Sequence, residues 1–173
     1  ANGTTYQFNV KETDAAGNTS AATGNFAVIG DTAAPTASVT VAAIKNTANA
    51  VVQSTEVGTA YLVKDTVSVT KLTDITSAAD SQYNSVSIAA ANTSTNLAAT
   101  GLVDGTYKVY TVDAAGNLSA RSTNAVTVDT TAPGAPVITD GQGANDNAVL
   151  TNDNTPTLVI SAATGSTAVS YTH

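Results

Sequence analysis

The chain has 173 residues, with 13 acidic and 6 basic side chains, a formal net charge of −7, and no Cys, Met or Trp. Ala and Thr account for 32 and 31 residues, whereas only 11% of residues are charged. This composition disfavours a helical bundle, whose exposed faces need Glu, Lys, Gln and Arg. The acidic excess argues against a nucleic-acid binder. The 42% hydrophobic content argues against a disordered chain, so a β-rich protein remains.

The acidic residues are almost all aspartates, and only Glu12 and Glu56 are glutamates. Asp is depleted in strands and favoured in turns, which predicts that the negative charge lies in loops. Short carboxylates in loops, beside Asn and backbone carbonyls, are the ligands that Ca²⁺ prefers. The alternative is that these aspartates only terminate strands.

Two motifs recur along the chain at nearly the same spacing. Residues 14–18 and 113–117 read DAAGN, 99 residues apart, and residues 31–35 and 129–133 read DT-x-AP, 98 residues apart. This recurrence predicts a tandem array with a period of about 98 residues. The DT-x-AP motif suits a linker, because Pro resists both helix and strand pairing. The predicted organisation is the end of one repeat (1–34), a complete repeat (35–132) and the start of a third (133–173).

Short runs of alternating apolar and polar residues predict the strands of the complete repeat. In chain order, the predicted strands are residues 37–41, 48–52, 59–63, 66–70, 85–89, 107–112 and 125–128. Residues 78–80 or 89–91 are candidates for a helical turn. About seven short antiparallel strands in roughly 100 residues predict an all-β architecture of tandem immunoglobulin-like sandwiches.

One segment sharpens the prediction of an immunoglobulin-like fold. Residues 102–109 read LVDGTYKV, which is the spacing of a tyrosine corner. In that arrangement the Tyr107 ring packs in the core and its hydroxyl bonds the backbone a few residues upstream. Tyr6 occupies the same place in the preceding repeat. The alternative is that Tyr107 is an ordinary aromatic strand residue.

Residues 101–119, together with the linker 129–133, resemble the bacterial Ig-like repeats of very large Gram-negative surface adhesins. These adhesins are the biofilm-associated, type I-secreted, RTX adhesin-like kind. Residues 56–63 and 151–156 resemble further parts of the same repeat. The DAAGN motif also occurs in bacterial fibronectin type III modules attached to polysaccharide hydrolases. The resemblance implies an extracellular, cysteine-poor stalk on the bacterial cell surface, which often binds Ca²⁺ at the joints between neighbouring repeats.

The topology of such a sandwich predicts one cation site at the joint that follows the complete repeat. Asp104 precedes the penultimate strand and Asp129 lies in the linker, so both are expected near the exit of the domain. Asp140 and Asp153 lie in loop segments close to the entry of the third repeat. Six to eight oxygens at about 2.3–2.6 Å are needed for Ca²⁺. At the preceding joint Asn2 stands where Asp104 does, which removes one charge.

A second candidate site is predicted at the joint that precedes the complete repeat. The DAAGN turn joins the last two strands at the pole opposite the exit, where Asp113 and Asn117 can meet Asp31 of the first linker. The alternative is that DAAGN is only a tight turn in which Gly116 and Asn117 supply positive φ. Glu56 follows a predicted strand and is a further acidic residue near a pole, but the sequence does not place it securely.

No catalytic constellation is present in the sequence, and no enzyme activity is expected. The only His is the terminal His173, and there is no Cys, so Ser/His and Cys/His nucleophile systems and zinc sites lack their residues. No phosphate-binding glycine motif precedes a predicted helix. No run of 18 apolar residues is present, so no membrane insertion is expected.

The leading hypothesis is a non-enzymatic extender, or stalk, of a bacterial cell-surface adhesin, with neighbouring repeats as partners and Ca²⁺ as a structural ion at the joints. A second hypothesis is a module that binds a carbohydrate or a surface, for which Tyr61, Tyr83 and Tyr110 are the candidate aromatic residues. A third is a spacer of a secreted polysaccharide hydrolase. A fourth is a self-assembling extracellular fibre in which residues 1–34 and 133–173 of different chains complete each other.

Overall fold

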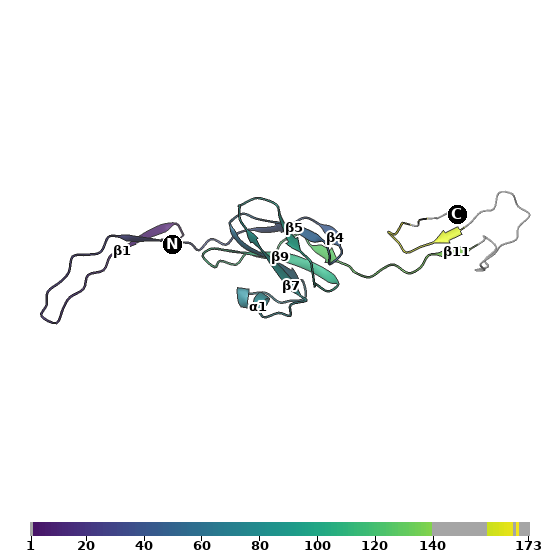
Figure 1. Cartoon of the computed structure of the whole chain (residues 1–173). Coiled ribbons are helices and arrows are strands. Elements are labelled where there is room, and N and C mark those ends of the chain that lie inside the picture. The colour runs from purple at the N-terminus through teal and green to yellow at the C-terminus, as the bar shows by residue number, and fades with distance from the viewer. Residues whose placement is uncertain (1, 140–158, 168, 170–173) are drawn as a thin grey trace, which may run out of the picture. The chain divides into compact units, whose positions relative to one another are not determined.

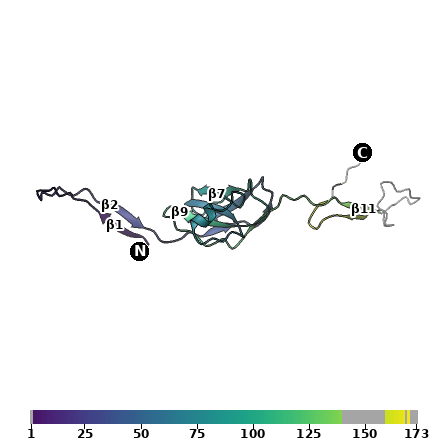
Figure 2. The same ribbon diagram turned by 90° about the horizontal axis from the view of Figure 1, so that it is seen from below.

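The computed structural model describes residues 2–139, 159–167 and 169. It divides into two compact units, Ala1–Thr130 and Thr131–His173. Nearly all regular structure is β, as predicted (Figures 1 and 2). None of the helices in the described residues is long and apolar enough to cross a membrane.

The centre of the first unit is a sandwich of two sheets. One sheet has three strands, in the order β3 (Ala37–Val39), β5 (Asn49–Ser54) and β8 (Thr95–Ala98). The other has five, in the order β4 (Ala42–Ile44), β10 (Val126–Val128), β9 (Gly105–Asp113), β6 (Gly58–Lys64) and β7 (Tyr83–Ile88). This all-β, immunoglobulin-like arrangement agrees with the fold class predicted from the spacing of the strands.

The core lies between the two sheets and is built from the inward-facing half of each strand. Val52, Leu62, Leu97 and Val109 are completely buried. Most of their neighbours along each strand are less buried, which is the two-residue period of a half-buried strand, although Val63 beside Leu62 is buried as well. On β9, for example, Val109 faces the core and Tyr110 faces the other way. The small side chains of the sequence therefore supply the interior of one compact domain.

The first predicted strand, residues 37–41, is shorter in the structure: β3 ends at Val39, and β4, which the sequence did not predict, begins at Ala42 in the other sheet. β3 pairs with β5 in an antiparallel ladder, whereas β4 pairs with β10 in a parallel ladder, Ala42 facing Val126. The expectation of purely antiparallel pairing was therefore wrong for β4. A single strand cannot satisfy both sheets, so the chain crosses from one to the other between Val39 and Ala42.

Tyr107 forms the predicted tyrosine corner. Its side chain is completely buried, and its hydroxyl donates a hydrogen bond of 2.6 Å to the carbonyl oxygen of Val103, four residues upstream. Burial is the main influence on this phenol and raises its pKa. The corner fixes the approach of the chain to β9.

Two predicted elements between β6 and β7 were wrong. Residues 66–70 are not a strand, and the helical turn lies at α1 (Leu72–Thr76) instead of at 78–80 or 89–91. The Asp74 carboxylate accepts hydrogen bonds from the backbone N–H of Thr70 and of Lys71, at 2.8 and 3.0 Å. These local bonds stabilise the start of α1 and override the strand preference of the preceding β-branched residues.

The flanking parts of the chain contain strand pairs that resemble pairs within the sandwich. β1 (Thr4–Phe8) and β2 (Phe26–Gly30) form an antiparallel pair, as β9 and β10 do. In the second unit, β11 (Val137–Thr139) and β12 (Val159–Ser161) form an antiparallel pair, as β3 and β5 do. Tyr6 lies on β1 with 46% of its surface exposed, whereas Tyr107 is fully buried.

Candidate metal centre

The DAAGN turn has the same internal hydrogen bonds in both of its copies. In the second copy, Asp113 Oδ1 accepts from the backbone N–H groups of Ala115 and Asn117, at 2.9 and 2.8 Å. In the first, Asp14 Oδ1 accepts from those of Ala16 and Asn18, at 2.9 and 2.8 Å. The motif is therefore a tight turn, as the simpler interpretation of the sequence predicted.

The positive φ of the turn comes from glycine alone. Gly17 and Gly116 have φ values of 91° and 93°, and the Asn that follows each of them is outside this region. A β-carbon at Gly116 meets no atom within 4 Å, so the requirement for glycine is one of backbone conformation and not of space. The expectation that Asn117 shares the positive φ was wrong.

The hydrogen bonds of the turn keep its aspartates ionised. Desolvation raises the pKa of the Asp113 carboxyl, but hydrogen bonds from Asn117 and Ala115 outweigh it, so the pKa lies below its ordinary value. For Asp14, hydrogen bonds from the side chain and backbone of Asn18 lower the pKa in the same way. A permanently charged carboxylate is what a hard cation requires.

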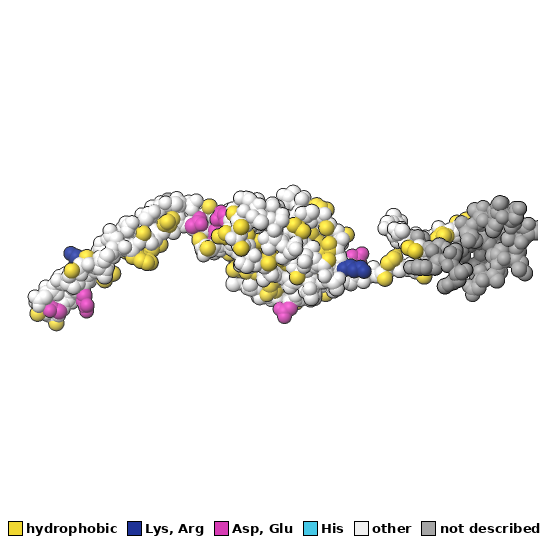
Figure 3. Space-filling model, turned by 45° about the horizontal axis from the view of Figure 1, so that its top comes forward, with side chains coloured by type: hydrophobic (Ala, Val, Ile, Leu, Met, Phe, Trp, Pro, Cys, Tyr) yellow, Lys and Arg dark blue, Asp and Glu magenta, His cyan; other side chains and the backbone are white. Residues whose placement is uncertain are grey.

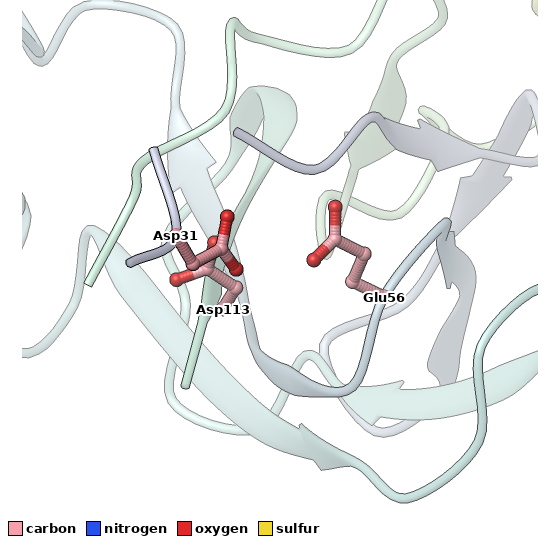
Figure 4. Close-up of side chains that lie close together, drawn as sticks. All are labelled: Asp31, Glu56 and Asp113. Atoms are coloured by element: carbon pink, nitrogen blue, oxygen red, sulfur yellow. The ribbon is translucent and has the colours of Figure 1, made fainter. Parts of the chain in front are cut away.

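Three carboxylates from separate segments meet at one end of the sandwich (Figure 4). Asp31 belongs to the linker before β3, Glu56 to the turn between β5 and β6, and Asp113 to the end of β9. One oxygen from each lies within 4.8 Å of the other two. Asp113 is buried, Glu56 is half-buried and Asp31 is exposed. We call these three residues the linker triad.

Strand pairing places Glu56 beside Asp113. Gly58 of β6 is paired with Asp113 of β9, and Glu56 precedes Gly58 by two residues. The backbone of Glu56 is held by its N–H, which donates to Ser54 Oγ at 3.2 Å. A β-carbon at Gly58 would lie 2.0 Å from the carbonyl oxygen of Val112, so only glycine permits this approach.

Asn117 contributes to the linker triad as a hydrogen-bond donor. Its side-chain amide N–H donates to Asp113 Oδ2 at 2.8 Å and to the backbone carbonyl of Asp31 at 3.3 Å. The predicted role of Asn117 was that of an oxygen ligand. In the structure its amide nitrogen is directed at the triad residues, so Asn117 orients Asp113 and contacts the linker.

The separation of the triad oxygens would allow one cation to contact all three carboxylates. Because Ca²⁺ binds oxygens at about 2.3–2.6 Å, two ligands of the same ion are at most about 5 Å apart. The observed limit of 4.8 Å satisfies that condition. Six to eight ligands are needed in total, so the backbone carbonyls around the linker and water would complete the shell.

Of the four residues predicted for the other joint, the structure describes Asp104 and Asp129. Asp104 Oδ1 accepts from the backbone N–H and the hydroxyl of Thr130, at 2.9 and 2.6 Å, so Asp104 holds the start of the linker that follows β10. Asp129 is exposed, and its N–H donates to the carbonyl of Ile44 at 2.9 Å. Asp140 and Asp153 lie outside the described residues. Within the described part of the chain, the linker triad is the acidic group that combines three residues.

Asn2 reproduces the arrangement of Asp104 in the preceding repeat. Its side-chain oxygen accepts from the backbone N–H of Thr32 at 3.1 Å, as Asp104 accepts from Thr130. Both residues therefore bind the backbone of the linker that follows their own hairpin. This shared contact favours a structural role for the Asp104 carboxylate.

The position of Glu56 was the part of the site that sequence reasoning missed. Glu56 was recognised as an acidic residue near a pole, but nothing placed it beside Asp113. The available signal was Gly58, because a glycine within a strand often marks a place where another strand's backbone approaches closely. Glu56 lies two residues before that glycine.

Most of the protein surface on the face shown in Figure 3 is uncharged. Small hydrophobic and neutral polar side chains cover the sandwich there, and the charged side chains form small separate groups. On this face, the acidic side chains are therefore confined to a few places.

Comparison with known proteins relates the chain to part of a chitinase. The chain is 39% identical over 139 residues to chitinase A1 of Niallia circulans. The alignment covers 75% of the chain but 18% of the chitinase, so the chain spans less than a fifth of the length of that relative. No protein-family model matches the chain.

Proposed function

We propose that the chain is a non-catalytic extender segment of a secreted or cell-surface bacterial protein, in which Ca²⁺ stiffens the joint between consecutive immunoglobulin-like repeats. The observation that carries the proposal is the linker triad, because it joins a residue of the linker, Asp31, to two residues of the following domain. A cation bound by all three stabilises only the arrangement that brings them together.

The repeat pattern supports an adhesin stalk as the first candidate host. In such a protein, many copies of one domain hold a distal binding domain away from the cell. The lightly charged surface suits this role, since it offers little for other molecules to bind. The proposed location is the extracellular bacterial surface.

The similarity to chitinase A1 supports a second candidate host, a secreted polysaccharide hydrolase. In that protein the chain would be a spacer between a catalytic domain and another module. The absence of Cys, and of any His before the last residue, supports a segment that performs no catalysis in either host. The two candidate host proteins, an adhesin and a polysaccharide hydrolase, differ in which domains the repeats would connect. In both, Ca²⁺ would stiffen the joint between repeats.

Small-angle X-ray scattering of the whole chain, with CaCl₂ and with a chelator, tests the proposal. Extracellular calcium modules bind Ca²⁺ with dissociation constants of roughly 0.1–1 mM. A few millimolar Ca²⁺ is therefore expected to increase the maximum dimension of the chain and to narrow the range of dimensions in solution. The Glu56→Gln variant is expected to lose this response. The matched control is Asp80→Asn, which removes an exposed carboxylate outside the triad. Identical scattering of the wild-type chain in both conditions would reject a calcium-stiffened joint.

A further inference from the structure

Tyr110 lies on the outer face of the five-stranded sheet, where it forms one wall of a hollow. It is half-buried on β9, and its cross-strand partner on β6 is Tyr61. The two rings therefore lie on neighbouring strands of the same face, because directly opposed residues of an antiparallel pair share a side. The main core cluster of the domain includes Leu62 and Val109 of the same two strands, and neither ring belongs to it.

The loop that follows β6 forms the other walls. Five consecutive residues, 65–69, line the hollow together with Tyr110 and Arg121, and its volume is about 380 Å³. That volume is at the small end of the range for sites that bind small molecules. The loop is the segment in which a strand was expected, and its departure from the sheet opens this space.

The charges at the hollow neutralise each other. Arg121 Nη1 and Asp65 Oδ1 form an ion pair of 3.0 Å, in which both side chains remain partly exposed. Burial raises the pKa of the Tyr110 phenol, the positive charge of Arg121 lowers it, and the negative charge of Asp65 raises it. The phenol is therefore close enough to the ion pair to feel both charges. The side chains that line the hollow therefore carry no net charge that would attract a free anion or cation.

We propose that this hollow binds a neutral saccharide of one or two pyranose units. The Tyr110 ring offers a flat apolar surface for the C–H face of a sugar ring. The Asp65 carboxylate accepts hydrogen bonds and the Arg121 guanidinium donates them, so the pair matches adjacent sugar hydroxyls. The hydroxyls of Thr66 and Ser68 add groups that both donate and accept.

A second hollow of similar size lacks these features. It has a volume of about 350 Å³ and is lined by residues of β3 and β5 together with Ser94 and Asn124. Its walls contain no aromatic ring and no charged side chain. The comparison shows that volume alone does not distinguish the Tyr110 hollow; its residue types do.

This inference is independent of the proposed extender function. The linker triad takes its residues from the linker and from the turns at one end of the sandwich, and no residue is shared between the triad and the Tyr110 hollow. A failure of calcium binding would leave saccharide binding unaffected, and the reverse also holds.

Titration of the ¹⁵N-labelled chain by NMR tests the inference, with maltose, cellobiose, lactose and N,N′-diacetylchitobiose as probes at up to roughly 10 mM. At least one disaccharide is expected to give saturable shifts confined to residues 65–69, Tyr110 and Arg121 and their neighbours. Tyr110→Ala and Arg121→Ala are each expected to weaken binding by roughly tenfold or more. The control Tyr83→Ala, which removes a ring outside the hollow, is expected to bind as wild type.

Two results would overturn the inference. One is the absence of saturable shifts with all four disaccharides. The other is binding that Arg121→Ala and Tyr110→Ala leave unchanged. Arg121 is mostly exposed, so its substitution keeps the test valid even if Tyr110→Ala fails to fold.

Discussion

Tyr107 shows how one side chain supports the sandwich through both packing and hydrogen bonding. Its ring is completely buried and its hydroxyl is 2.6 Å from the Val103 carbonyl oxygen. The Tyr107→Phe substitution keeps the ring and removes the donor. We expect the free energy of unfolding to fall by about 1–2 kcal/mol, because the partly buried hydrogen bond to the Val103 carbonyl is lost. Urea denaturation measures this, with Tyr83→Phe, on an edge strand, as the control. An equal and negligible effect of both substitutions would contradict the role of the corner.

Asp113 is expected to make the stability of the domain depend on pH in the acid range. Because the pKa of Asp113 is lower in the folded chain than its ordinary value of 3.8, its contribution is present above that value. It is lost as the pH falls through the lowered folded pKa. Asp14 and Asp74 have lowered pKa values as well, so the melting temperature is expected to decline below about pH 4.

Melting curves of the Asp113→Asn variant between pH 7 and pH 2 check this expectation. The variant replaces an acceptor oxygen with an amide nitrogen facing the Asn117 amide, so it is expected to be less stable than wild type at pH 7. The difference should shrink as the pH falls through the lowered pKa of the wild-type carboxyl, because the carboxyl then becomes protonated. A constant difference across the whole range would show that the charge of Asp113 does not stabilise the fold.

The residue types of the DAAGN turn predicted the hydrogen bonds within the turn, but not all of the residues that lie around it. An Asp followed by Ala-Ala-Gly-Asn specifies a turn, because the Asp side chain bonds the backbone ahead of it and Gly permits positive φ. The approach of Asp31 follows from the topology of the sandwich. The position of Glu56 depends on the register of β6 against β9, which one sequence does not reveal.

At the scale of the strands, Gly58 determines how closely β6 and β9 approach each other. The Gly58→Ala substitution puts a β-carbon 2.0 Å from the Val112 carbonyl oxygen and also requires a φ of 151° from alanine. We expect a loss of about 1–3 kcal/mol in the free energy of unfolding, measured by chemical denaturation.

Substitutions at two other glycines separate the steric cause from the conformational cause of the stability loss expected for Gly58→Ala. Gly101 has a φ of 81° with open space around its β-carbon position, so Gly101→Ala reports conformational strain alone. Gly24 has open space and no such φ, so Gly24→Ala is expected to be nearly neutral or slightly stabilising. If Gly58→Ala costs no more than Gly101→Ala, the steric contact with Val112 has no energetic importance.

The sequence did not predict β8 (Thr95–Ala98). Two further differences from the prediction share a physical cause. Residues 66–70 alternate like a strand, yet Asp74 captures the backbone N–H of Thr70 and begins a helix. β4 is three residues long and is recruited by pairing with β10, a partner more than 80 positions away. In both cases contacts outside the local pattern decide the conformation. The longer strands β6 and β9 carry their own alternating signal and were predicted to within a few residues.

At the scale of the whole molecule, calcium is expected to raise the thermal stability of the chain. An ion that binds only the folded chain adds RT ln(1 + [L]/Kd), or about 1.4 kcal/mol at a tenfold excess over Kd. For a domain of roughly this size, that corresponds to an increase of about 5–10 °C in the melting temperature. Scanning calorimetry with CaCl₂ and with a chelator measures the increase.

The triad variants provide the control for this measurement. Glu56→Gln and Asp31→Asn are expected to abolish most of the increase, and Asp80→Asn is expected to preserve it. An increase of the same size in all three variants would place the calcium away from the linker triad. The period of about 98 residues, visible in the sequence, predicted where such a joint would lie. It did not predict that Glu56 lies close to Asp31 and Asp113.

The parallel pairing of β4 with β10 determines how the domain responds to tension. A pull on the two ends of the repeat reaches β4 through β3, and it then acts on the start of β4 and on the end of β10, which lie at opposite ends of a parallel pair. The hydrogen bonds between the two strands are then loaded in shear and must break together. In the antiparallel hairpin of β1 and β2, a pull on the outer ends opens the pairs one after another from Thr4 and Gly30. The parallel pairing of β4 with β10 therefore makes the sandwich resist extension along the chain more strongly than the β1–β2 hairpin does.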